Sequence, residues 1–210
     1  DTIEIHPAYE ETVFRVSLFG DEVERITEVD PVTGDHIKDL EELIIFPATH
    51  YMADTSVMNR AIKGIEVELQ ESLKRFEKEN KLLESQRLRM RTEYDLEMMS
   101  ELGFCSGIEN YSAHIDGRSS GERPFTLLDY FPDDFLVVLD ESHVAIPQLH
   151  GQHEGDRSRK LTLIEHGFRL PSAADNRPLR FDEFINRVGQ VVLVSATPGK
   201  WEKENSTRIV

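Results

Sequence analysis

The chain has 210 residues, of which 39% are hydrophobic and 30% charged, and its formal net charge is −16. This composition predicts a globular protein with at least one buried core and excludes wholesale disorder. The acidity argues against a free-standing binder of nucleic acid or of membranes. The charge is uneven, because residues 1–50 hold 13 acidic and 3 basic side chains, whereas residues 151–210 hold 8 and 10.

No stretch of the sequence approaches the eighteen apolar residues of a membrane-spanning helix, so we expect no contact with a membrane. The single cysteine, Cys105, cannot form an internal disulfide, which fits the reducing cytoplasm. The sequence opens without an initiator methionine or a secretory segment, and residues 1–5 already alternate in the manner of a β-strand. We therefore expect a cytoplasmic protein and a chain that is part of a longer one.

Residues 1–50 predict a small antiparallel sheet. Three runs rich in β-branched or apolar residues, at residues 2–5, 13–19 and 23–29, are separated by turn residues that include Gly20 and Asp21. We expect the sheet to end near residues 44–47.

From Asp54 or Thr55 the hydrophobic period changes to that of a helix, with Asp54, Thr55 or Ser56 as the N-cap. A break at Asn80 would leave a second helix from about Leu82 to Ser100, since Asn tolerates the left-handed conformation that ends helices. The apolar stripe is expected to pack onto a neighbouring part of the protein. Its members are Met58, Ile62, Ile65, Leu69, Leu73, Phe76 and Leu83.

Two later apolar runs, at residues 135–139 and 191–194, lack alternation. Such runs are typical of parallel strands that are covered on both faces by helices. The first run ends in Asp140, Glu141, Ser142 and His143. Carboxylates at the C-terminal edge of a parallel sheet can hold Mg²⁺ through water and activate a water molecule for nucleoside triphosphate hydrolysis. The alternative is a solvated loop or a helix cap.

The second run ends in the small, hydroxyl-rich turn of residues 195–199, which on its own is equally consistent with an ordinary turn. Together and in this order, the two strand ends resemble motifs II and III of superfamily 2 helicases. Further segments resemble the UvrB family, and the resemblance spans essentially the whole chain. They include CSGIENYS at 105–112, GFRLPSA at 167–173, and residues 46–50, 88–92, 129–132 and 175–179.

The resemblance implies an α/β fold: a partial RecA-like superfamily 2 helicase lobe with a helical subdomain and a small antiparallel β module. The β module, at residues 1–50, would be part of the UvrA-interaction module. The helical subdomain would comprise residues 51–122 and 147–181, and the lobe residues 123–146 and 182–210. The family acts in nucleotide excision repair, where UvrA loads UvrB onto damaged double-stranded DNA, UvrB uses ATP and Mg²⁺ to verify the damage, and UvrC is then recruited.

The resemblance also implies roles for individual residues. Asp140 would hold Mg²⁺ through water, Glu141 would be the catalytic carboxylate, and His143, Ser195 and Thr197 would couple the nucleotide state to movement between lobes. Arg15 resembles a UvrA-contacting position, although a solvated strand arginine is the alternative. The family's DNA path would include Arg91, Glu109 and Gln148, for which a merely solvated surface is the alternative.

The chain departs from the family's usual pattern at several places. Ala113 stands where an arginine is usual and Ser17 where an acidic residue is common, which puts a basic contact and a partner contact in doubt. His150 and His153 have a spacing that a metal could use, but we expect them to be solvated in a glycine-containing loop.

No G-x-x-x-x-G-K-[ST] phosphate loop occurs in the sequence, nor is the second helicase lobe present. We therefore predict that these 210 residues alone hydrolyse no ATP. Two other functions stay open at this point: a non-catalytic module that docks UvrA, and another superfamily 2 helicase that acts on RNA.

Overall fold

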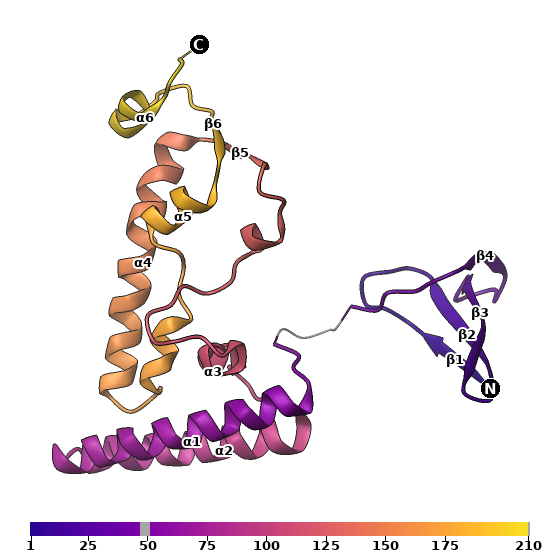
Figure 1. Ribbon diagram of the computed structural model, residues 1–210, viewed down its shortest axis with the longest axis horizontal. Coiled ribbons are helices and arrows are strands. Elements are labelled where there is room, and N and C mark those ends of the chain that lie inside the picture. The colour runs from indigo at the N-terminus through magenta and orange to yellow at the C-terminus, as the bar shows by residue number, and fades with distance from the viewer. Residues whose placement is uncertain (47–50, 210) are drawn as a thin grey trace. The chain divides into compact units, whose positions relative to one another are not determined.

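The computed structural model describes residues 1–46 and 51–209, and the chain divides into two compact units, Asp1–His50 and Tyr51–Val210 (Figure 1). Each unit is described by itself. Residues 47–50, which complete one of the motifs quoted above, lie outside the described residues.

Four strands form an antiparallel sheet in chain order within residues 1–46: β1 (Thr2–Ile5), β2 (Val13–Phe19), β3 (Glu22–Val29) and β4 (His36–Leu40). Gly20, at a φ of 62°, lets a short turn join β2 to β3. The buried apolar side chains of this unit are Val13, Phe14 and Val29. The first three predicted strands are thus confirmed to within a residue.

The expected end of the sheet at residues 44–47 is wrong. The Oδ1 atom of Asp30 accepts hydrogen bonds from the backbone N–H groups of Val32 and Thr33, which folds the chain back at once. The returning segment therefore pairs with β3 as β4 and ends at Leu40, while residues 42–46 form no strand.

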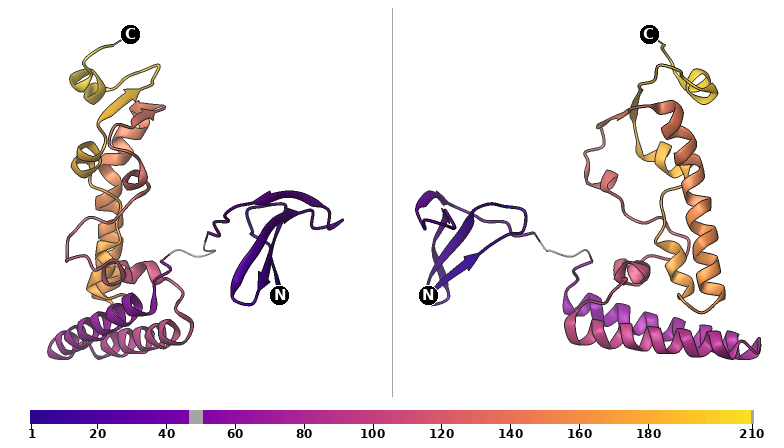
Figure 2. Two further views of the ribbon diagram at one scale, coloured as in Figure 1. Left: turned by 45° about the vertical axis from the view of Figure 1, so that its right-hand side comes forward. Right: turned by 180° about the vertical axis from the view of Figure 1, so that it is seen from behind.

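The second unit opens with a helical hairpin, in which α1 (Thr55–Lys78) lies beside α2 (Leu82–Leu102) (Figure 2). Asp54 is the N-cap of α1, since its side chain accepts hydrogen bonds from the backbone N–H groups of Ser56 and Val57. Asn80 is left-handed at a φ of 56°, as expected of the break. The second helix continues past the expected Ser100 to Leu102.

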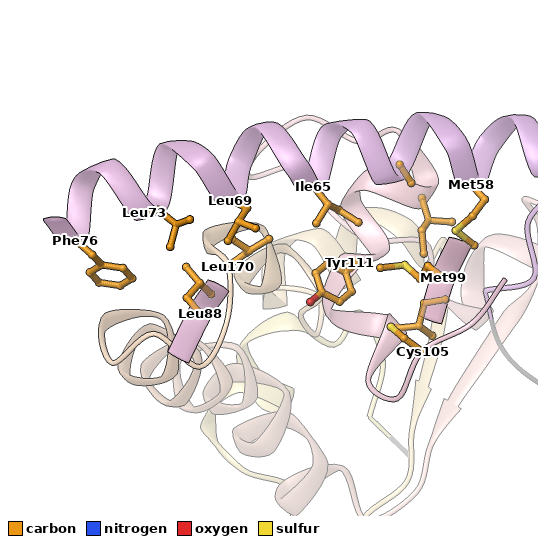
Figure 3. Close-up of a cluster of buried hydrophobic side chains, with 13 residues drawn as sticks. Met58, Ile65, Leu69, Leu73, Phe76, Leu88, Met99, Cys105, Tyr111 and Leu170 are labelled. Atoms are coloured by element: carbon orange, nitrogen blue, oxygen red, sulfur yellow. The ribbon is translucent and has the colours of Figure 1, made fainter. Parts of the chain in front are cut away.

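The apolar stripe of α1 packs against α2 and the segments that follow it (Figure 3). One face of α1 contributes Met58, Ile65, Leu69, Leu73 and Phe76 to a hydrophobic cluster. The cluster also contains side chains from α2 and from later segments of the chain. These are Leu88, Met99, Cys105, Ile108, Tyr111, Ile115 and Leu170. The prediction for Leu83 is wrong: the turn at Asn80 resets the helical phase, and Leu83 is 62% exposed.

Cys105 is free, and its burial in this cluster raises the pKa of its thiol to about 12. It is therefore an unreactive apolar group at neutral pH.

The remaining elements of this unit include a pair of parallel strands, β5 (Leu136–Leu139) and β6 (Gln190–Leu193). The longer helices are α4 (Ser142–Glu165), α5 (Phe181–Arg187) and α6 (Lys200–Asn205). The short ones are α3 (Ser112–Asp116), η1 (Ile108–Tyr111), η2 (Leu127–Tyr130) and η3 (Pro171–Asp175). None of the helices in the described ranges combines the length and apolar character that crossing a membrane requires.

The parallel pairing of β5 and β6 is as predicted, but the expectation that both faces are covered is wrong for this chain. Val137 and Leu139 pack with Phe184 and Val188, whereas Leu136 and Val138 are 56% and 58% exposed. Successive side chains of a strand point to opposite faces, and the cluster formed with α5 covers one of them. The helices and the small antiparallel sheet of the predicted fold class are present, while the RecA-like lobe remains a prediction.

Helix α4 runs unbroken across the boundary expected between residues 146 and 147, and its far end meets α2. Arg87 Nη1 donates a hydrogen bond to the carbonyl oxygen of His166, and its guanidinium lies 4.2 Å from the centre of the Phe168 ring. Gly167 adopts a left-handed φ of 71°, and a Cβ atom there would lie only 2.3 Å from the carbonyl oxygen of Glu84. This close backbone contact joins α4 to the hairpin.

Candidate functional site

The two motif-bearing strands end side by side, and the turns that follow them form what we call the strand-end site: Asp140, Glu141, His143, Ser195 and Thr197. Asp140 directly follows β5, and its Oδ1 atom accepts a hydrogen bond from the backbone N–H of Glu141 at 2.9 Å. Glu141 caps α4 with a left-handed φ of 46°. Such a backbone is uncommon for a residue with a side chain, and strained backbones of this kind cluster at active sites and ligand clamps.

His143 connects the two turns. Its Nδ1 atom lies 2.8 Å from Ser195 Oγ and 3.3 Å from Glu141 Oε2. Ser195 Oγ also accepts a hydrogen bond from the backbone N–H of Thr197 at 3.1 Å. A neutral imidazole can accept the Ser195 proton at Nδ1, and a protonated one can donate to either oxygen. The position of this ring is therefore sensitive to the charge of the carboxylate and to the position of the serine turn.

A second side-chain contact lies next to this site and connects α4 to α6, and no local sequence pattern predicts it. Ser142 Oγ donates a hydrogen bond to Glu202 Oε1 at 3.3 Å, between the start of α4 and the first turn of α6. Ser142 is 0% exposed and Glu202 is 4% exposed. Backbone N–H groups, Gly199's among them, hold the pKa of the Glu202 carboxyl below its usual value, with a further contribution from the Ser142 hydroxyl.

The donor set fits Mg²⁺ held jointly with a ligand rather than by the protein alone. Within residues 1–46 and 51–209, no group of three or more His, Cys, Asp or Glu side chains is placed to hold a metal ion. Asp140 and Glu141 are both exposed and present carboxylate oxygens at a strand end. Mg²⁺ commonly binds one or two carboxylates, keeps several waters and takes its other ligands from phosphates.

The expected partner-contacting residue, Arg15, lies on β2 opposite Glu4 of β1. Its Nε and Nη2 atoms donate to Glu4 Oε1 at 2.9 and 2.7 Å, and its side chain is 38% exposed. Neighbouring strands add Arg25 and Asp39, which form a two-bond ion pair. Arg15 thus belongs to a charged surface of the sheet, and its guanidinium is oriented by Glu4.

Arg91 has structural partners inside the protein. Its Nε donates to Asp95 Oδ2 at 2.9 Å and its Nη2 to the carbonyl oxygen of Ser106 at 2.9 Å. The same Asp95 oxygen accepts the Tyr111 hydroxyl at 2.8 Å, and the Asp95 side chain is only 3% exposed. This carboxylate raises the pKa of Arg91, and burial raises the pKa of Tyr111. Arg91 therefore compensates a buried negative charge.

Glu109 lines a cavity of about 410 Å³, which we call the basic cavity because its lining holds four cations and two carboxylates. The charged residues that line it are Glu109, Asp156, Arg159, Lys160, Arg169 and Arg177. Asp156 pairs with Lys160 at 2.7 Å and with Arg159 at 3.1 Å. No local sequence pattern predicts this cluster, because its cations come from separate segments of the chain. Gln148, the third residue of the expected DNA path, is exposed on α4 and does not line this cavity.

The expectation that His150 and His153 lie in a loop is wrong, and of the two only His150 is exposed to solvent as expected. Both lie within α4, which accommodates the glycines of this segment. The ring of His150 stacks on Phe181 with a centre-to-centre distance of 3.6 Å, and His153 is buried with its Nδ1 atom 3.0 Å from Glu154 Oε1.

Comparison with known families assigns the first unit and the first part of the second. The UvrB interaction domain matches residues 1–51, which include the four-stranded sheet, and the UvrB third helical domain matches residues 56–117, from α1 to α3.

Individual relatives extend the match over the whole chain. The UvrABC system protein B of Renibacterium salmoninarum is 60% identical over 210 residues, all of this chain. The proteins of the same name from Clavibacter michiganensis subsp. michiganensis and Pseudarthrobacter chlorophenolicus are 61% and 62% identical over 202 residues, 96% of this chain. The chain spans about 30% of the length of these curated relatives, 29% or 30% in each case.

Proposed function

Because the chain belongs to the UvrB family, we propose that it forms part of a nucleotide excision repair protein that binds damaged DNA and hydrolyses ATP. The observation that carries the proposal is the strand-end site. Two adjacent carboxylates follow one parallel strand, and a histidine links them to a serine that follows the next. An open α/β sheet binds its ligands at this edge.

In the proposed reaction Asp140 holds Mg²⁺ through water, and the ion, when bound, neutralises charge that develops on the transferring phosphate. Glu141 orients the attacking water and accepts its proton. His143 contacts both Glu141 and the serine turn, so a change at the carboxylate alters its contact with Ser195. Thr197 fixes that serine through its backbone N–H. These contacts support a role of the three residues in coupling nucleotide state to movement between lobes.

In the basic cavity Arg169 best supports contact with the phosphates of damaged double-stranded DNA, since the other three cations pair with Asp156 or Glu183. Arg169 makes a hydrogen bond to the carbonyl oxygen of Phe168, which leaves most of its donors for a ligand. Glu109 lines the cavity and Gln148 lies on the neighbouring helix α4, while Arg91 supports the Ser106 loop next to Glu109.

We also propose that the four-stranded sheet docks UvrA and that UvrC joins the complex later. The match of residues 1–51 to an interaction domain supports the first step, and the pairing with Glu4 pre-orients Arg15 for a partner carboxylate. A non-catalytic docking module is therefore the second candidate function. It predicts that UvrA binds while the two acids at the strand end have no effect on any activity.

The test compares Glu141→Gln with the unaltered full-length protein that carries this chain. We expect the substitution to lower DNA-stimulated ATP hydrolysis by about 100-fold or more, because the general base is lost, while a fluorescent ATP analogue still binds. Glu204→Gln, on the exposed side of α6, is the matched control and should leave turnover unchanged. Unchanged hydrolysis in Glu141→Gln would contradict the proposal, and stimulation by RNA alone would indicate a different helicase.

A further inference from the structure

Two side-chain hydrogen bonds connect the segment that follows β5 with the segment that follows β6, and they differ in their surroundings. One, between His143 and Ser195, involves motif residues and is partly exposed. The other, between Ser142 and Glu202, is buried and couples residues sixty positions apart. We call the second contact the Ser142–Glu202 bridge.

Glu202 is tightly accommodated. A buried carboxylate is costly unless its oxygens receive hydrogen bonds, and here the donors are backbone N–H groups at the start of α6 and the Ser142 hydroxyl. Gly199 leaves room for this arrangement, because a Cβ atom at that position would lie 2.9 Å from Glu202 Oε2. The absence of a side chain at Gly199 therefore allows the Glu202 carboxylate to stay within hydrogen-bonding distance of Ser142.

The bridge bears directly on the conformation of Glu141. Ser142 follows Glu141 and is fixed twice: its backbone N–H donates to the carbonyl oxygen of Val194 at 3.0 Å, and its hydroxyl donates to Glu202. Glu141 holds its left-handed backbone between Asp140 and this anchored serine. Losing either anchor would allow the peptide between residues 141 and 142 to rotate toward a commoner conformation.

We propose that Glu202 is a positioning residue of the strand-end site, which through Ser142 holds the Glu141 carboxylate in its working orientation and in register with the Ser195 turn. This inference rests on the proposed ATP hydrolysis and adds a residue that acts without touching the nucleotide. We expect the loss of Glu202 to lower the turnover number and not the affinity for the nucleotide. The reason is that the Ser142–Glu202 bridge orients the Glu141 carboxylate without contacting the nucleotide.

The experiment uses Ser142→Ala, Glu202→Gln and the double variant in the full-length protein. A glutamine has one acceptor oxygen in place of two, so it cannot satisfy both the α6 backbone and the serine. We expect each single variant to lower kcat for ATP by about tenfold with KM within about twofold, and the double variant to be no worse than the poorer single one. Multiplying effects, or a loss confined to KM, would overturn the proposal.

Asn205→Ala is the matched control for a general weakening of α6, since Asn205 Nδ2 donates to the carbonyl oxygen of Trp201 at the far end of that helix. It should leave kcat unchanged, and a tenfold loss in this variant would also overturn the proposal.

A second readout needs no nucleotide. Backbone amide exchange at residues 195–199 should be faster in Ser142→Ala than in the unaltered protein, and Gly199→Ala should reproduce the effect by displacing Glu202. Unchanged exchange in Ser142→Ala would refute the bridge as a link between the turns. Should Glu141→Gln leave hydrolysis intact, the proposed function fails, whereas this exchange measurement still decides whether the bridge connects the turns.

Discussion

At the scale of single residues, Arg91 was predicted to contact DNA, and in the structure its guanidinium binds groups within the protein. Its two donors reach Asp95 Oδ2 and the carbonyl oxygen of Ser106, so removing it leaves a buried carboxylate without its cation. We expect Arg91→Ala to lower the free energy of unfolding by about 2 kcal/mol, reduced from the usual cost of breaking a buried pair because the arginine itself is partly exposed. Urea denaturation with a fluorescence readout measures the change.

Arg89, on the same helix, provides the comparison. Its nearest carboxylates, on Glu77 and Glu93, are 3.9 and 3.7 Å away and exposed, so Arg89→Ala should change stability by less than about 0.5 kcal/mol. Equal losses in the two variants would contradict the interpretation of Arg91 as the partner of a buried acid. The comparison also matters for DNA binding, because weaker binding by Arg91→Ala supports a direct contact only if the variant remains folded.

At the scale of elements, the junction between α4 and α2 depends on a glycine. A side chain at Gly167 meets both a left-handed backbone and the Glu84 carbonyl oxygen, whereas Gly103 has a similar φ of 69° at the end of α2 and open space around it. We expect Gly103→Ala to cost about 1 kcal/mol from backbone strain alone. Gly167→Ala should cost at least about 2 kcal/mol more, because the two backbones must separate. Thermal unfolding of both variants tests this, and equal shifts in Tm would contradict the close contact.

The same scale shows what could be predicted from sequence. Local chemistry narrowed the helix cap to residues 54–56, of which Asp54 is the cap. It also located the break at Asn80 and the first three strands, since each depends on neighbouring residues. The strand β4 was missed because its formation depends on the turn at Asp30 bringing a polar segment back to β3. The prediction that helices cover both faces of β5 and β6 was wrong. A run of apolar residues indicates that both faces of a strand are apolar, but it does not indicate which element packs against each face.

For the candidate site too, the sequence indicated the residues that local patterns mark and not those whose partners are distant in the chain. The motif residues at 140–143 and 195–197 were singled out because two apolar runs predicted neighbouring parallel strands and because the strand ends resemble helicase motifs II and III. Glu202 and the cations of the basic cavity were missed, since their partners are distant in sequence and no local pattern marks a buried hydrogen bond or a shared cavity wall. The family resemblance singled out Arg91 for the DNA path but gave no indication of its buried partner Asp95.

At the scale of the whole molecule, the chain contains only some of the groups that ATP hydrolysis requires. Phosphoryl transfer requires groups that position the phosphates as well as a carboxylate that activates water. The strand-end site offers the carboxylates, but the 210 residues contain no G-x-x-x-x-G-K-[ST] loop to cradle the phosphates.

We therefore expect the 210-residue chain alone to show no magnesium-dependent release of phosphate from ATP above a buffer control, with or without DNA. The full-length protein that carries it, measured at the same concentration, should hydrolyse ATP, because phosphate-binding groups outside these residues complete the site. Circular dichroism of the isolated chain verifies that it is folded when the assay is run. Turnover by the isolated chain that disappears in Glu141→Gln would show instead that these residues position the phosphates by themselves, and that the two carboxylates act without a separate phosphate loop.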